Sequence, residues 1–167
     1  IPGGSDVPSF DFYCHLLSLP LVFGTNISSI PTTVSYLAPD MSLVKRWSQK
    51  IQYNQNIRVG LVWSGNQFEL PGYEYMYRKR NVHLSLISTL FSIAKIDFYS
   101  LQVGNAAQQT EAYSHVANFF DLSSDIRDFA DTAALIANLD LVISVDTAVA
   151  HLTGAMGKKV WLLSRFD

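Results

Sequence analysis

Five short runs of strand-forming residues, separated by segments with helical periodicity, constrain the fold of this chain more than any other feature. The runs are IRVGLVW, DFYSLQ, NFFDL, LVISV and VWLLS, at residues 57–63, 97–102, 118–122, 141–145 and 160–164. Helical segments are expected between them, at 83–94, 107–117, 128–136 (beginning at Asp128 or Asp131) and 147–156. Strands that alternate with helices at this spacing predict right-handed βαβ units. The sequence therefore predicts an α/β fold with a Rossmann-like, doubly wound parallel sheet.

The residues before the first run have a different character. Residues 1–40 carry five of the six prolines, which favours short elements joined by turns. From Met41 to Ile51 the apolar residues fall on one helical face, and Asp40 is a natural N-cap. We therefore divide the chain into residues 1–40, a linker helix within 41–56, and a domain at 57–167. The chain begins at Ile1 and stops just after a predicted strand, so we expect it to be cut at both ends.

Composition excludes several classes of function. With 49% hydrophobic and 16% charged residues the chain should fold as a soluble globular protein, and a net charge of -2 argues against nucleic acid as a partner. No segment approaches the roughly 20 apolar residues of a membrane span, and the first residues do not form a signal peptide. A single cysteine, Cys14, excludes an intrachain disulfide and suits the cytoplasm. We expect Cys14 to be a small buried residue.

Common catalytic motifs are absent from the sequence. It contains no GxGxxG after a strand, no GxxxxGK[ST], no HExxH and no GxSxG, which disfavours dinucleotide oxidoreductases, P-loop enzymes, zinc proteases and serine esterases. The histidines are not spaced as metal ligands (His15, His83, His115, His151). We therefore expect neither a metal nor a cofactor.

The segment LDLVISVDTAVAHLTGAMGKKVWLL, from residue 139, is the first candidate site. Asp146 follows a predicted strand and precedes a helix, so it can serve as an N-cap that accepts hydrogen bonds from the amides of Ala148 or Val149. The same helix start offers amides and a positive dipole end to a phosphate, with the Thr147 hydroxyl beside them. His151 lies on the same face as Thr147 and is either a phosphate or sugar contact or a histidine held by a neighbouring carbonyl.

The segment after the first strand is the second candidate site. Ser64, Gly65 and Asn66 form a donor-rich turn there, and a long loop follows that ends in the basic triplet Arg78, Lys79 and Arg80. This triplet indicates a solvated surface or a phosphate clamp more than an RNA site. Gln102, at the end of the second strand, either contacts a ligand or simply ends the strand.

Four segments together resemble one protein family. DLVISVDTAVAHLTGAMGKKVWLL, RVGLVWSGN, FYSLQ and DFADTAALI, at residues 140–163, 58–66, 98–102 and 128–136, resemble the C-terminal domain of heptosyltransferase-like glycosyltransferases. The nearest subgroup is the bacterial proteins in which this domain follows tetratricopeptide repeats. The resemblance implies the second lobe of a GT-B fold, which holds a nucleotide-sugar donor in the cleft between two Rossmann-like lobes. Residues 13–40 resemble the end of the first lobe, so residues 1–40 would be its remnant.

The resemblance also implies roles for individual residues. Asp146, Thr147 and Ala148 would lie at the donor diphosphate with His151 beside it, and Ser64, Gly65 and Asn66 would face them. Arg80 would offset charge on the leaving diphosphate. Gln102, Asp121 and Leu122 would make other contacts with the nucleotide-sugar. Two positions depart from the family pattern, because Ala148 replaces a common glycine and Lys159 a common proline.

The sequence thus predicts the donor-binding part of a metal-independent, inverting glycosyltransferase with an unknown acceptor. The catalytic base is expected in a first lobe that is nearly all missing, so this fragment by itself should be inactive. A nucleotide-sugar epimerase and a non-catalytic scaffold that kept the fold are the alternatives. Apolar surface that the missing lobe would cover makes a homodimer plausible.

Overall fold

The structure is a computed structural model that describes residues 9–30, 35–65 and 79–164. The chain divides into two compact units, Ile1–Thr33 and Val34–Asp167. Among the described ranges, none of the helices has the length and apolar character that crossing a membrane requires.

The first unit consists of short helical pieces. They are a 3-10 helix η1 (Leu16–Ser18), a single turn α1 (Leu19–Val22) with Pro20 at its start, and a 3-10 helix η2 (Ile27–Ser29) capped by Asn26. None of its described residues is buried. The expectation that Cys14 is buried is therefore wrong, because the described part of this unit forms no core in which a thiol can be enclosed.

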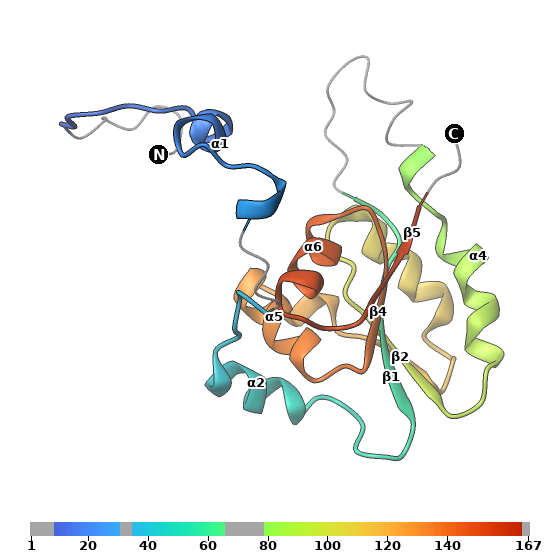
Figure 1. Cartoon of the computed structure of the whole chain (residues 1–167). Helices are drawn as coiled ribbons and strands as arrows, with labels where there is room; N and C mark the ends of the chain where they lie inside the picture. The colour runs from blue at the N-terminus through green and yellow to red at the C-terminus, as the bar shows by residue number, and fades with distance from the viewer. Residues whose placement is uncertain (1–8, 31–34, 66–78, 165–167) are drawn as a thin grey trace. The chain divides into compact units, whose positions relative to one another are not determined.

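The second unit contains a five-stranded, fully parallel sheet. Its strands are β1 (Ile57–Val62), β2 (Ile96–Ser100), β3 (Phe119–Asp121), β4 (Leu141–Val145) and β5 (Val160–Leu163), in the order β3-β2-β1-β4-β5. All five predicted strands are present, and the predicted Rossmann-like, doubly wound arrangement is confirmed (Figure 1). The strand order reverses at β1, which lies between β2 and β4.

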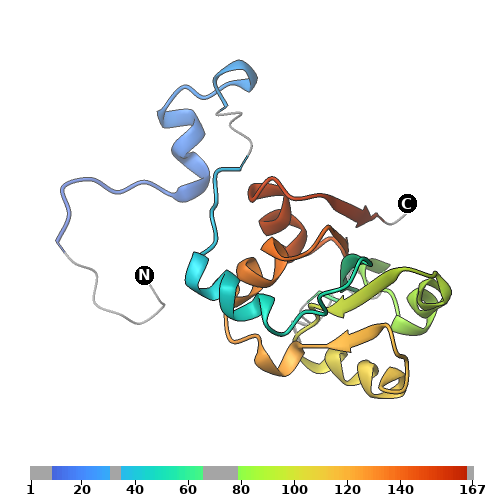
Figure 2. The same cartoon turned by 90° about the horizontal axis from the view of Figure 1, so that it is seen from below.

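Helices cover both faces of this sheet (Figures 1 and 2). On one face, α2 (Met41–Ser48), α5 (Phe129–Ala137) and α6 (Ala148–Ala155) enclose a core that includes Trp47, Tyr99 and Leu135. On the other face, α4 (Leu84–Ile87) and the 3-10 helices η3 (Ser88–Ser92) and η4 (Asn105–Tyr113) cover a second core. Successive residues of β2, Phe98 and Tyr99, enter opposite cores, as the alternation of side chains along a strand requires.

Two predicted α-helices are largely 3-10 helices. Only Leu84–Ile87 of the segment 83–94 is α-helical, and η4 replaces the helix expected at 107–117. In the first segment the hydroxyls of Ser88, Thr89 and Ser92 each donate to the carbonyl three residues earlier. Such side-chain bonds compete with the regular ladder at helix ends, which accounts for the tighter turns. A fifth short 3-10 helix, η5 (Ser123–Asp125), follows β3.

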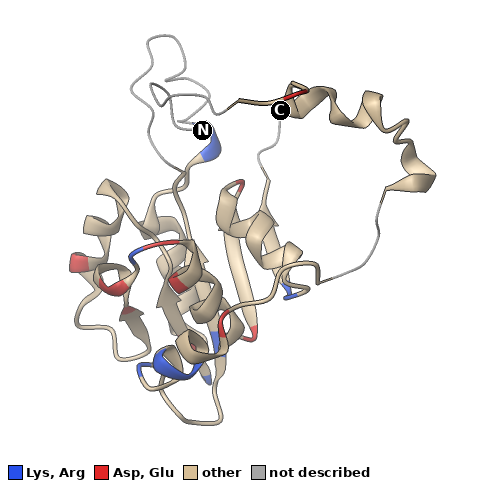
Figure 3. Cartoon of the chain, turned by 90° about the vertical axis from the view of Figure 1, so that its left-hand side faces the viewer, with Lys and Arg blue, Asp and Glu red and all other residues tan. Residues whose placement is uncertain are grey.

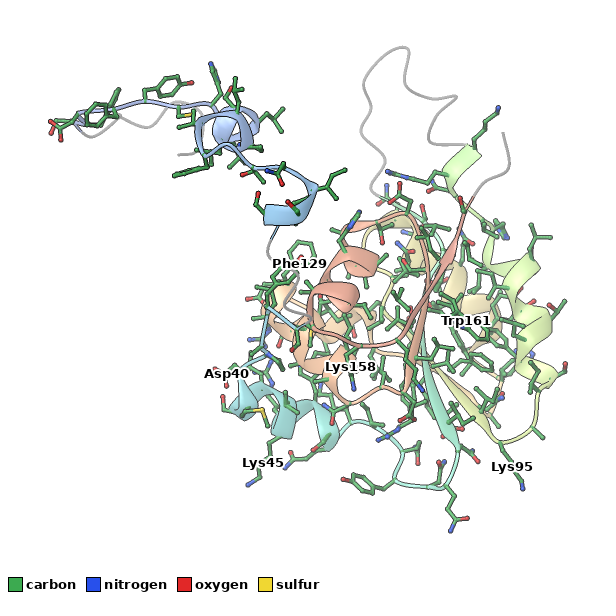
Figure 4. All side chains as sticks on the ribbon, in the orientation of Figure 1. Asp40, Lys45, Lys95, Phe129, Lys158 and Trp161 are labelled. Carbon is green, nitrogen blue, oxygen red and sulfur yellow. The ribbon has the colours of Figure 1, made fainter. Side chains whose placement is uncertain are left out.

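The two helix caps that the sequence predicts outside the candidate site are present. The Asp40 carboxylate accepts hydrogen bonds from the amides of Ser42 and Leu43 at the start of α2, where Figure 4 labels it. Asp128 caps α5 by accepting from the amide of Asp131. Of the two acids considered for this cap, Asp128 is therefore the N-cap, and the side chain of Asp131 has other partners.

An ion pair joins β1 to β4 at the amino ends of these strands. Asp140 accepts hydrogen bonds from Arg58 Nε at 3.0 Å, from Arg58 Nη2 at 2.9 Å and from the Arg58 backbone amide at 2.9 Å. Hydrogen bonds from the Arg58 side chain, chiefly, and from its amide lower the pKa of Asp140 below the ordinary value of 3.8, against the opposing effect of burial. The pair holds together the two strands between which the strand order reverses.

We expect Asp140→Asn to be less stable than the wild type at neutral pH. Because the pKa of Asp140 is lower in the folded state, its stabilisation is complete above the ordinary value of 3.8 and disappears as the pH falls through the folded pKa. The difference between variant and wild type should therefore shrink in acid. Urea unfolding measured between neutral pH and about pH 2 tests this, and a difference that does not depend on pH would contradict it.

Candidate functional site

The carboxyl ends of β1 and β4 lie side by side where the strand order reverses, with Val62 paired to Ser144. In open parallel sheets, ligands bind beyond the carboxyl ends of the strands at such a point. A cavity of about 760 Å³ opens there, within the range of small-molecule sites. Its lining comes from the end of β1, from the segments that follow β1 and β2, and from the starts of α5 and α6: Val62, Ser64, Gly65, Arg80, Leu101, Gln102, Val103, Gly104, Ile126, Arg127, Asp128, Phe129, Thr132, Thr147, Ala148 and Val149.

The amino end of α6 forms one side of this cavity. Its N-cap is Thr147, and no side chain among the described residues caps the helix. The Thr147 hydroxyl lies 3.0 Å from the Ser144 hydroxyl instead. Within the part of the chain that the structure describes, the backbone amides of Ala148 and Val149 therefore have no side-chain acceptor, and they carry the partial positive charge of a helix start.

Asp146 is not the N-cap that the sequence offered as one interpretation. Because the helix starts one residue later than that interpretation requires, Asp146 precedes the cap, and its carboxylate lies 3.6 Å from Nε2 of His151. The two side chains form an ion pair whenever His151 is protonated. His151 is 81% exposed, so it is not held between helix and loop by a carbonyl. Neither residue lines the cavity that the described residues form.

Gly65 and Arg80 meet at the carboxyl end of β1. The amide of Gly65 donates to Asn81 Oδ1 at 2.9 Å, and the amide of Val82 donates to the Trp63 carbonyl at 2.9 Å. A Cβ atom added to Gly65 would overlap Arg80 Nη2 and lie 2.9 Å from Arg80 Cζ. The missing side chain thus makes room for the guanidinium at the cavity wall. Ser64 is buried beside it, while Asn66 and Arg78 fall outside the described residues.

The side chain of Gln102 forms hydrogen bonds with the backbone that follows β1 and β2. Its Oε1 accepts hydrogen bonds from the amides of Trp63 at 3.1 Å and Ser64 at 2.8 Å. Its Nε2 donates to the carbonyls of Ser64 at 3.0 Å and Val103 at 2.9 Å. Gln102 lines the cavity, yet its amide group is engaged by the backbone that forms the cavity wall. It holds Ser64 in place.

Asp121 and Leu122, expected at the nucleotide-sugar, do not line the cavity formed by the described residues. The Asp121 carboxylate accepts from the Thr110 hydroxyl at 2.6 Å and from the Ser123 amide at 3.0 Å, so it joins η4 to the segment after β3. Leu122 packs against the core beneath α5.

The segment that leads into α5 contributes cavity residues that the sequence analysis missed. Arg127 brings a second cation to the lining. Phe129, labelled in Figure 4, is the first residue of α5 and is 60% exposed. One signal was available, because an arginine and a phenylalanine flank the recognised cap Asp128.

Charge is distributed without a single dominant face. Figure 3 shows basic and acidic positions interspersed along the described residues. No three His, Cys, Asp or Glu side chains within those residues gather as metal ligands do. The cations of the cavity, Arg80 and Arg127, therefore act in a local setting and not as part of a wide basic surface.

Part of this chain is similar to a known protein family. Residues 101–163 match glycosyltransferase family 9 (heptosyltransferase). The matched segment includes Gln102, Arg127 and the start of α6, but neither Gly65 nor Arg80. No curated protein matches the chain.

Two solved structures share the fold. The E. coli ADP-heptose LPS heptosyltransferase II has a TM-score of 0.57 at 11% identity, covering 81% of this chain and 41% of that chain. The E. coli heptosyltransferase WaaC, solved with ADP-2-deoxy-2-fluoro heptose, has a TM-score of 0.53 at 15% identity, covering 87% of this chain and 44% of that chain. The likeness confirms the α/β fold predicted for the second lobe of a GT-B protein. The chain spans less than half the length of either structure.

The hydrogen bonds of Gln102 with the backbone at the cavity wall lead to a prediction about stability. Gln102→Ala would leave buried backbone groups of Trp63 and Ser64 without partners, so the free energy of unfolding should fall by about 1–3 kcal/mol. Gln49→Ala, at an exposed position, is the matched control and should change it by less than about 0.5 kcal/mol. Urea denaturation of both variants provides the measurement. Equal stability of the two would show that Gln102 does not hold this wall.

Proposed function

We propose that the cavity binds the nucleoside diphosphate of a sugar donor, and that the chain is the donor-binding part of a metal-independent, inverting glycosyltransferase. The observation that carries the proposal is the convergence of the uncapped start of α6 with Arg80 on one cavity at the point of strand-order reversal. The match of residues 101–163 to glycosyltransferase family 9 supports it independently.

The chemistry of sugar transfer explains why such a site is suitable. When the bond between the sugar and the diphosphate breaks, negative charge grows on the leaving phosphate oxygen. Fixed positive groups that meet this charge lower the barrier, because they need not reorganise during the reaction. In the proposal, the diphosphate accepts hydrogen bonds from the amides of Ala148 and Val149, from the Thr147 hydroxyl and from the Arg80 guanidinium.

His151 has a supporting role in this proposal. It lies one turn into α6, and its Nε2 is 3.6 Å from the Asp146 carboxylate. When protonated it can donate to a phosphate or sugar oxygen at the rim, with Asp146 balancing its charge. Its exposure permits this, since no described part of the protein encloses the ring.

The apolar part of the cavity lining suits a nucleoside. Ile126, Phe129 and Val149 contribute to it, and the exposed ring of Phe129 offers a face on which a base can stack. Ile126 and Val149 offer shape and apolar contact in place of a hydrogen-bonding pattern, so they do not by themselves select one base. Four expectations from the sequence stay predictions: a catalytic base in the first lobe, the inactivity of the isolated chain, a homodimer, and kinship with tetratricopeptide-linked enzymes.

The test is calorimetric titration of the protein with UDP, ADP and GDP, for the wild type and Thr147→Glu. Negative charge at a helix start is favourable by about 0.3–1 kcal/mol, so the variant should fold. It should nevertheless repel a diphosphate and lose binding. Thr89→Glu makes the same change in η3, which contributes nothing to the described cavity lining, and should bind as the wild type does. Failure of the wild type to bind any of the three nucleotides would refute the proposal.

Gly65→Ala tests the contact with Arg80. The three atoms nearest to the added Cβ all belong to the flexible end of Arg80, so folding should persist while the guanidinium leaves its place. Nucleotide affinity should fall by about tenfold to a hundredfold, as expected for one charged hydrogen-bonding group, and Arg80→Ala should show a similar loss. Calorimetry is again the measurement.

The matched control for this experiment is Gly154→Ala in α6. Apart from the chain neighbours and the backbone of its own helix, a Cβ at that position meets no described atom within 4 Å, so affinity should not change. If Gly65→Ala binds nucleotide as tightly as the wild type, the proposed place of Arg80 beside Gly65 is wrong.

A further inference from the structure

We propose that Asp131 is a positioning residue of the nucleotide site. It holds the rim segment of the cavity, Ile126–Phe129, and Arg127 in particular, against the linker helix α2. The inference rests on the proposed function, because its consequence is read as nucleotide affinity. It concerns a residue that lies outside the cavity lining.

The carboxylate of Asp131 joins two separate parts of the second unit. Asp131 is 3% exposed. One oxygen, Oδ1, accepts hydrogen bonds from Arg46 Nη2 and, at 3.0 Å, from Trp47 Nε1, both on α2. The other, Oδ2, accepts from the backbone amide of Arg127 at 3.2 Å. A single side chain thus links the linker helix to the residue before the cap of α5.

This pattern differs from ordinary helix capping. Asp131 is the third residue of α5, and an acid at that position commonly reaches back to the amide of the N-cap, here Asp128. Asp131 instead reaches one residue further, to the amide of Arg127, while its own amide donates to Asp128 Oδ1 at 2.9 Å. The first bond holds the backbone of Arg127, and the second holds the side chain of Asp128. Arg127 therefore enters the cavity from a backbone that is held in place.

The charges around Asp131 favour its ionised form. Burial alone raises the pKa of this carboxyl, but hydrogen bonds from Trp47 and Arg127 and the charges of Arg46 and Arg127 outweigh it and lower the pKa. An ionised carboxylate has two acceptor oxygens, which the α2 donors and the Arg127 amide share between them. An asparagine has one acceptor oxygen. Because α2 brings two donors to the Asp131 side chain and the rim brings one, Asp131→Asn should lose the bond from the Arg127 amide.

A double-mutant cycle on nucleotide binding tests the inference. Arg127→Ala should weaken the affinity for the nucleotide that binds best by about tenfold. Asp131→Asn should weaken it to a similar extent. In the double variant the two losses should not add, because Arg127 is already displaced once Asp131 no longer holds it. Asp140→Asn removes a comparable link at the opposite end of the sheet and should leave both the affinity and the effect of Arg127→Ala unchanged.

Amide hydrogen exchange, followed by NMR, gives a readout without nucleotide. The Arg127 amide should exchange at least about tenfold faster in Asp131→Asn than in the wild type, because its acceptor is lost. The same amide should be unaffected by Asp140→Asn. Unchanged exchange at Arg127, or additive losses of affinity in the cycle, would overturn the inference while the proposed function stands.

A second pair of variants avoids changing the buried carboxylate. Arg46 is 48% exposed in its side chain, so Arg46→Ala removes a charged partner of Asp131 while the carboxylate keeps its hydrogen bonds from Trp47 and Arg127. We expect a several-fold loss of nucleotide affinity, which Arg46→Lys should restore. Lys45→Ala, the neighbouring position of α2 labelled in Figure 4, is the control and should have no effect.

The outcomes separate the inference from the proposed function. A wild-type protein that binds none of the three nucleotides refutes the proposed site and, with it, any positioning role for Asp131 in that site. A wild type that binds, together with an Arg46→Ala variant that binds equally well, overturns only the inference.

Discussion

The reversal of strand order at β1 is the constraint on which the site depends. Because β2 and β4 lie on opposite sides of β1, the chain that leaves β1 packs through α4 on one face, and the chain that leaves β4 packs through α6 on the other. The two connections diverge at the carboxyl edge, and the sheet leaves a cavity between them. The Arg58–Asp140 pair joins β1 and β4 at their amino ends, on the side of the sheet opposite the cavity.

At that edge, α6 begins without a side-chain cap. A threonine at an N-cap usually offers its hydroxyl to the helix amides, but the Thr147 hydroxyl lies against Ser144 instead. The helix thus forgoes a local stabilisation of order 1 kcal/mol, and its first amides stay available to an anion. Asp146, which could have capped the helix instead, lies one residue too early, and its carboxylate is 3.6 Å from Nε2 of His151.

Sequence patterns predicted the sheet well because strands buried on both faces are nearly continuous apolar runs. They failed where a residue or a spacing supports two local structures. Asp146 satisfies the rules for a cap, and only the exact start of α6 decides against it. The serines and threonines around Ser88 fit an α-helical face, yet their hydroxyls favour 3-10 turns. Arg127 and Phe129 reach the cavity through a packing of α5 that depends on Asp131, a contact between residues more than eighty positions apart in sequence.

The two cations of the cavity are placed by different physical means. The Arg80 guanidinium occupies space that a Cβ atom at position 65 would fill, so its position depends on Gly65 being a glycine. The backbone amide of Arg127 is held by a hydrogen bond to the buried carboxylate of Asp131. In both cases contacts within the protein place the residue that carries the charge before any ligand binds. Charged groups that are placed in advance need not reorganise during a reaction, which is the condition under which electrostatic stabilisation of a leaving group is most effective.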